Sequence, residues 1–166
     1  LLNSLENKAI ANIAQKHLSE IEDALYQVNS YQEYSRTNYR IVKHILQEFS
    51  FVFHEVLTDK RLEKWKNQIF VDLILRFFVV SYLIQKGKIR QGFIDNLWFS
   101  VYLDQNDPEY KIRMEFKQAF PQWDMDYFIP QEEWSKIFKK QTIATSQLVE
   151  LIEHRMNPQV ENWREL

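Results

Sequence analysis

The stretch FVDLILRFFVVSYLIQKGK, residues 70–88, is the most apolar part of the chain. A membrane-spanning helix needs about 20 mostly apolar residues. Here the mainly apolar run covers only residues 77–84, and two charged residues, Asp72 and Arg76, precede it. Because a charge at the bilayer centre costs roughly 2.5 to 3.5 kcal/mol on insertion scales, we expect no membrane span within these residues.

The same stretch is instead typical of the buried centre of a helical bundle. Its second half has apolar side chains on all sides, so we expect Phe77, Val80 and Ile84 to be almost fully buried. Asp72 and Arg76 lie four residues apart and therefore share one helix face. The simpler interpretation is a pair on a solvent-facing strip, and the alternative is a buried functional pair.

Long helices are expected throughout, because the chain has only two glycines and four prolines in 166 residues and its apolar residues recur mainly at helical spacing. We predict a single all-α domain over residues 1–166. It should be a bundle of about five to seven helices around a long central apolar helix at about residues 59–86. Helix should exceed roughly 60% of the residues, well above the average for globular proteins.

Capping residues and prolines mark the expected helix boundaries. Thr58 and Asp59 can cap the central helix, and Gly87 can end it, because glycine tolerates the left-handed conformation at a helix C-terminus. Asp107 followed by Pro108 is a clear helix start. The other expected helices cover about residues 4–28, 37–57 and 93–103, and a last long helix runs from Pro130 to Pro158.

Charge and cysteine content limit the function. The chain has 21 Lys and Arg against 23 Asp and Glu, a net charge of -2, so no overall field attracts nucleic acid or an anionic membrane. The lack of cysteine excludes disulfides, thiolate metal sites and thiol catalysis. The sequence also lacks an Asn-x-Ser/Thr glycosylation acceptor. We expect a cytoplasmic protein, or one held at the cytoplasmic face of a membrane by an anchor upstream of Leu1.

The sequence contains no recognised catalytic motif. Gly-x-Ser-x-Gly is absent, and two glycines cannot form a phosphate-binding loop. His44, Glu48 and Glu55 share one helix face and could line a metal or proton-transfer site, but the Glu-x-x-His pattern of bundle metal sites is missing. We therefore expect no catalytic residue, no metal and no cofactor. A helical hydrolase without glycine motifs is the third functional hypothesis.

Basic residues cluster near several expected helix ends. Such side chains could bind phosphate by charge-assisted hydrogen bonds, or they could simply be solvated faces balanced by acidic neighbours. No nucleic-acid motif accompanies them, so we expect no sequence-specific nucleic-acid binding. The second hypothesis is a sensor that binds a small anionic ligand, a nucleotide or a lipid headgroup, between helices through Arg36, Arg40, Lys43, Arg76, Lys88 and Arg90.

Aromatic side chains make up 15% of the chain and lead to the first functional hypothesis. Exposed aromatic residues anchor protein interfaces, although core packing is the other explanation. The N-terminal helix either lies flat on the bundle or extends from it to form a homodimer and connect to an upstream anchor. We expect a non-catalytic protein–protein interaction or sensing module that forms a homo-oligomer, with an interface that includes Leu5, Ile13, Trp123, Tyr127, Phe128 and Trp134.

Overall fold

The computed structural model of the chain describes residues 2–31, 36–97, 104–124 and 128–157. In these ranges 77% of the residues are helical, with seven α-helices and no strand, which confirms the predicted all-α bundle. The α-helices are α1 (Lys8–Lys16), α2 (Leu18–Tyr31), α3 (Tyr39–Leu57), α4 (Lys66–Gln85), α5 (Pro108–Ala119), α6 (Gln131–Phe138) and α7 (Thr145–Met156), and the short 3-10 helices are η1 (Leu2–Ser4), η2 (Lys60–Trp65), η3 (Phe93–Asn96) and η5 (Pro121–Asp124).

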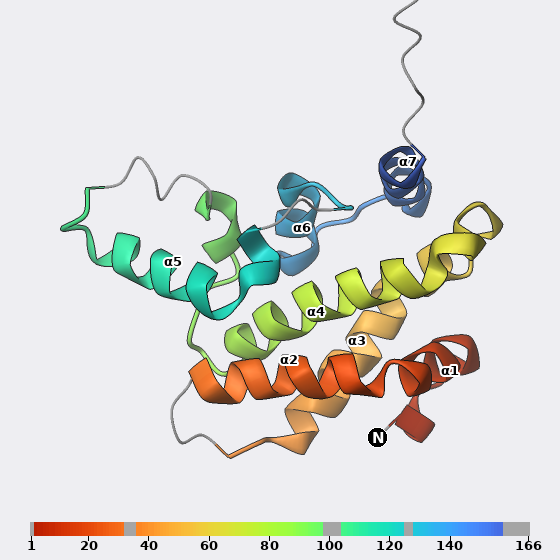
Figure 1. The fold of residues 1–166 in the computed structure, drawn as a ribbon, viewed down its shortest axis with the longest axis horizontal. Coiled ribbons are helices and arrows are strands. Elements are labelled where there is room, and N and C mark those ends of the chain that lie inside the picture. The colour runs from red at the N-terminus through yellow and green to blue at the C-terminus, as the bar shows by residue number, and fades with distance from the viewer. Residues whose placement is uncertain (1, 32–35, 98–103, 125–127, 158–166) are drawn as a thin grey trace, which may run out of the picture.

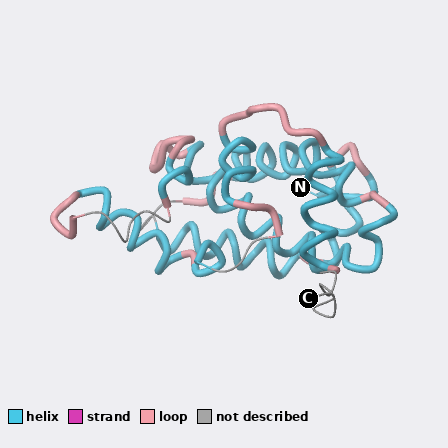
Figure 2. Tube along the Cα trace, turned by 90° about the horizontal axis from the view of Figure 1, so that it is seen from above, coloured by secondary structure: helices cyan, strands magenta, loops and turns pink. Residues whose placement is uncertain are grey.

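The apolar stretch forms α4, which runs through the middle of the molecule (Figure 1). α2 and α3 pack directly against α4, and the chain from α5 to α7 lies on the side of α4 opposite α2 (Figure 1). Figure 2, seen from above, shows the described parts of the chain as helices connected by loops. Neighbouring elements surround α4 over most of its length, so its apolar side chains can be buried on all sides of the helix.

The central helix ends as predicted but begins differently. Gly87 has φ +68°, and the amides of Gly87 and Lys88 donate to the carbonyls of Ile84 and Leu83, both at 2.9 Å. This is the paired hydrogen-bond pattern of a glycine-terminated helix. At the other end, Asp59 accepts from the Arg61 amide at 2.9 Å, but it caps the 3-10 helix η2. The predicted helix at residues 59–86 is therefore a 3-10 segment followed by α4.

The predicted N-terminal helix at residues 4–28 is wrong, because the chain breaks at His17 into α1 and α2. Asn7 caps α1 by accepting from the Ile10 amide at 3.2 Å. The His17 ring stacks on Phe70 with 5.6 Å between centroids, and its Nε2 lies 3.1 Å from Asn67 Oδ1. The break lets α1 pack on α3 while α2 packs on α4. The N-terminal segment therefore does not extend from the bundle as one long helix.

The predicted last helix, from Pro130 to Pro158, is also divided. α6 ends at Phe138 and α7 begins at Thr145. Lys140, in the gap, has φ 59°, the left-handed region that normally favours glycine. The amides of Lys140 and Gln141 donate to carbonyls of the last turn of α6, which completes its C-terminus. The helix expected at residues 93–103 starts as η3, and its part at residues 98–103 lies outside the described residues.

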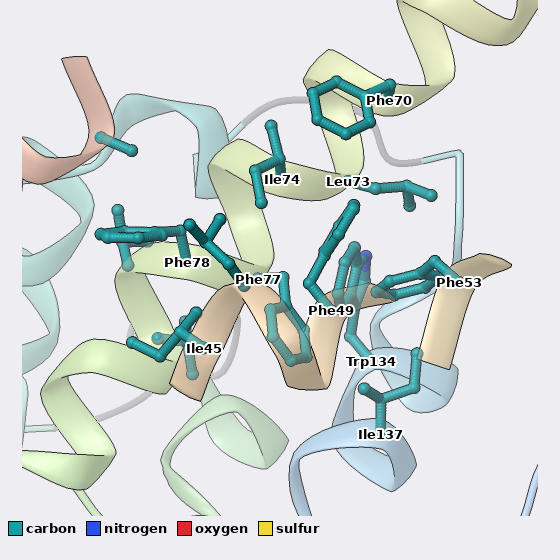
Figure 3. Packing of buried hydrophobic residues seen from close by; sticks show 14 of the residues in the cluster. Ile45, Phe49, Phe53, Phe70, Leu73, Ile74, Phe77, Phe78, Trp134 and Ile137 are labelled. Carbon is teal, nitrogen blue, oxygen red and sulfur yellow. The ribbon is translucent and has the colours of Figure 1, made fainter. Parts of the chain in front are cut away.

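The core is built from aromatic rings of α3, α4 and α6 (Figure 3). Phe77 lies 5.7 Å, between ring centroids, from both Phe49 and Phe53, and Phe53 lies 5.8 Å from Trp134. Phe77 and Val80 are buried as predicted. Ile84 is only partly buried, which corrects its predicted full burial, because the last turn of α4 borders a surface groove.

The segment Lys60–Gln85 is long and apolar enough to cross a bilayer when judged by length and composition alone. Its most apolar 18-residue window is 67% buried inside the bundle. Burial of this kind is typical of a core helix that is apolar on all sides. The prediction of no span is therefore compatible with how the segment packs.

Candidate functional site

Most of the residues predicted to form an interface are core residues. Leu5, Ile13, Trp123 and Trp134 are buried, and the two tryptophan rings lie 5.6 Å apart. Phe128 is half-buried against the same core, while Tyr127 lies outside the described residues. The aromatic content of Trp123 and Trp134 is therefore explained by core packing, and Ile13 packs in the core as well, while the buried Leu5 also borders a surface hollow.

Of the pair Asp72 and Arg76, Arg76 is buried and Asp72 is partly buried, which corrects the expected solvent-facing strip. Arg76 is 2% exposed, and its Nε donates to Asp72 Oδ1 at 3.0 Å. Its Nη1 donates to the carbonyl of Gln122, and its guanidinium lies 5.6 Å from the Trp123 ring. Arg76 therefore joins α4 to η5 and is not accessible to a ligand.

The other predicted anion-binding residues divide into two groups. Arg36, just before α3, and Arg40 and Lys43, in its first turns, are all exposed. Lys88 and Arg90 follow the end of α4 and line a hollow of about 470 Å³ together with Arg113, a residue that sequence analysis missed. We call this the basic hollow, and its lining consists of Gly87, Lys88, Ile89, Arg90, Gly92, Phe93, Glu109, Ile112 and Arg113.

A larger groove of about 820 Å³ lies between α3, the end of α4 and the α6–α7 connection. We call it the α3 groove. It is lined by His44, Glu48 and Glu55, the three residues that share a face in the sequence. However, in the part of the chain that the structure describes, no three potential ligands are placed to hold a metal ion. The position of these three side chains on one helix face is therefore no evidence for a metal site.

The carboxylates of the α3 groove are already engaged. Glu48 pairs with Lys140, the residue in the left-handed conformation, and Glu55 Oε2 accepts from Thr145 Oγ1 at 2.8 Å. Burial lowers the pKa of Lys140 below its ordinary value of 10.5. These contacts join α3 to the α6–α7 connection, through Lys140, and to the first residue of α7, through Thr145.

Phe51 is the most exposed large apolar side chain of the described residues, at 81%. It lines the α3 groove and also a second hollow of about 570 Å³, next to Leu5, Asn7 and Gln47. Sequence analysis missed Phe51, although its position gave a signal: it falls outside the apolar face of α3 that includes Phe49 and Phe53. We call Phe51 and the two hollows beside it the Phe51 face.

Searches of family models, of curated proteins and of solved structures found no match for this chain.

Proposed function

We propose that the protein is a non-catalytic helical interaction module that self-associates through the Phe51 face. The observation that carries this proposal is an aromatic ring, 81% exposed, between hollows of about 820 and 570 Å³. In a twofold-symmetric dimer the same patch meets itself, so each projection must find a hollow on the partner. The Phe51 face has both features side by side, and aromatic residues seated in hollows carry much of the affinity of protein interfaces.

The charges of the face support a second copy of this chain as the occupant. Glu48 is neutralised within the chain by Lys140, and Glu55 already accepts a hydrogen bond from Thr145. Glu6 and Glu55 also line the two hollows and have no Lys or Arg partner among the described residues, so like-charge repulsion between two such faces is limited to these carboxylates. Apolar side chains that include Val52, Ile143 and Leu148 line the groove and suit an entering aromatic ring.

Analytical ultracentrifugation of three proteins tests the proposal. The unchanged chain should be dimeric at high micromolar concentration. Phe51→Ala should weaken the dimer by more than about tenfold, because a central aromatic anchor is lost. Tyr26→Ala is the matched control, since Tyr26 is 74% exposed on α2 and should have no effect.

Circular dichroism must show equal helix content in the three proteins. A monomeric unchanged chain would contradict self-association. A Phe51→Ala dimer of unchanged affinity would place any association at another face.

A further inference from the structure

The basic hollow concentrates positive charge where the chain leaves α4 and passes the first turns of α5. Three cationic side chains, Lys88, Arg90 and Arg113, line it against one carboxylate, that of Glu109. Within the described residues, Lys88 has no ion-pair partner and is exposed. The hollow therefore keeps an excess of positive charge after its internal pairs are counted.

Glu109 stands between the two guanidinium groups. Its Oε2 accepts from Arg113 Nη2 at 2.7 Å, and its Oε1 lies 3.6 Å from Arg90 Nη2. The two arginines thus already hold an oxyanion that belongs to the chain itself. Planar guanidinium groups bind carboxylate and phosphate oxygens with the same geometry.

Arg113 and Glu109 differ in burial. The Arg113 side chain is 7% exposed, so packing fixes its position, whereas Glu109 is 51% exposed. A buried cation in a fixed position loses little freedom when an anion binds. The exposed Glu109 carboxylate can turn into water when another oxyanion takes its place on Arg113.

Apolar side chains form the rest of the hollow. Ile89 is buried, and Phe93 packs on Phe116 with 4.9 Å between ring centroids. Ile112 is 43% exposed and borders the opening. A hollow of about 470 Å³ with such walls accommodates more than a phosphate ion, and it suits a ligand with a short apolar body.

We propose that the basic hollow binds a phosphate monoester with a small apolar or aromatic body, and that Glu109 competes with the phosphate for Arg90 and Arg113. Lys88 supplies a further positive charge at the opening. A free metabolite and a lipid headgroup can both present this chemistry. The inference concerns a different surface from the proposed dimer face and does not depend on it.

Titration with phenyl phosphate, followed by calorimetry and by amide chemical shifts, tests the site. Shifts should concentrate at residues 87–93 and 109–113, and phenyl phosphate should bind more tightly than inorganic phosphate. The double variant Lys88→Gln, Arg90→Gln changes two exposed residues and should weaken binding by about tenfold or more, because charge-assisted hydrogen bonds are lost. Arg36→Gln, Arg40→Gln is the matched control, with two exposed cations before and in the first turn of α3, and should bind as the unchanged chain does.

The variant Glu109→Gln tests the competition. It should bind phenyl phosphate several times more tightly, because the competing negative charge is removed. Equal or weaker binding by a folded Glu109→Gln protein would overturn the role of Glu109. If that variant does not fold, the Lys88, Arg90 double variant still decides whether the site exists.

Vesicles distinguish the two sources of phosphate. Binding to phosphatidylcholine vesicles that contain phosphatidic acid, and not to phosphatidylcholine alone, together with competition by phenyl phosphate, would support the site and identify a headgroup as its ligand. Binding of phenyl phosphate without vesicle binding would support it with a free ligand. The proposal is overturned if neither probe binds saturably, or if the Lys88, Arg90 double variant binds as well as the unchanged chain.

Discussion

Asp72 is an interior carboxylate whose charge is only partly compensated. It accepts from Arg76 at 3.0 Å through Oδ1, while Oδ2 is buried without a hydrogen-bond partner in the described parts of the chain. Burial raises the pKa of Asp72 above its ordinary value of 3.8, although the charge and hydrogen bond of Arg76 act in the opposite direction. Loss of hydration therefore outweighs the attraction of the neighbouring cation, as is common for buried pairs.

This pKa shift makes a prediction about stability and pH. The folded chain holds the Asp72 proton more strongly than the unfolded chain, so Asp72 makes the free energy of unfolding fall as pH rises from 3.8 through the folded pKa. The variant Asp72→Asn lacks this contribution. Urea unfolding at a series of pH values should show the unchanged chain losing stability relative to Asp72→Asn from about pH 4 upward.

Asp59 provides a control of opposite sign. A side-chain hydrogen bond from Arg61, helped by the Arg61 backbone amide, lowers the pKa of Asp59. The stabilising contribution of Asp59 is therefore fully present above pH 3.8 and is lost as pH falls through the folded pKa. The free energy of unfolding of the unchanged chain, relative to that of Asp59→Asn, should therefore rise with pH. Parallel curves for the unchanged chain and Asp72→Asn would contradict the proposed desolvation of Asp72.

The burial of Arg76 also shows what residue-level reasoning cannot predict. Helical spacing correctly places Asp72 and Arg76 on one face of α4. Whether that face meets water depends on η5, which lies 46 residues further along the chain and supplies the Gln122 carbonyl. No local sequence pattern specifies this contact. Helical spacing therefore predicts the ion pair between Asp72 and Arg76 but not its burial.

At the level of helices, the sequence predicts ends that depend on local chemistry. Asp107 caps α5 with its side chain and Pro108 begins it, and Gly87, which has no Cβ, takes the left-handed conformation after α4. The breaks at His17 and at Lys140 were missed, because neither position has the glycine or proline that usually marks one. Tertiary packing determines both: His17 stacks on Phe70, and Lys140 reaches Glu48.

The two left-handed helix ends make a paired prediction. An added Cβ at Gly87 would meet no atom within 4 Å, so a steric clash is not expected. Gly87→Ala should therefore destabilise the protein by about 1 kcal/mol through backbone strain alone. At Lys140, both Ala and Gly remove the ion pair with Glu48, so comparing these two variants isolates the backbone. Lys140→Gly should be more stable than Lys140→Ala by about 1 kcal/mol in urea unfolding. Equal stability would mean that Lys140 does not hold its left-handed conformation in solution.

For the whole molecule, the sequence predicts the bundle and its centre better than its surfaces. Apolar spacing is enough to identify α4 as central and to bury Phe77 and Val80. A surface site instead needs side chains from separate elements, as when Arg113 of α5 joins Lys88 and Arg90. Which residues meet in this way depends on how the elements pack, and that is why Phe51 and Arg113 became apparent only in the structure.

The different burial of the helices predicts a graded stability across the molecule. Twelve of the 20 residues of α4 are buried, and α2 and α3 pack against it. In α5 only two of 12 residues are buried, Arg113 and Phe116. Elements with few buried contacts open locally at a lower free energy than the centre of a domain. Native-state hydrogen exchange should therefore find the slowest amides in α4 and faster ones in α5.

Low concentrations of urea separate the two kinds of opening. Exchange in α4 should accelerate with the urea dependence of global unfolding, because its amides open only when the bundle unfolds, whereas α5 should show almost no dependence. Phe77→Ala, expected to cost about 3 to 5 kcal/mol, should speed exchange in α4 while leaving the local opening of α5 unchanged. If α5 exchanged as slowly as α4 and with the same urea dependence, the chain would open as a single cooperative unit, and the lining of the basic hollow would be as rigid as the core.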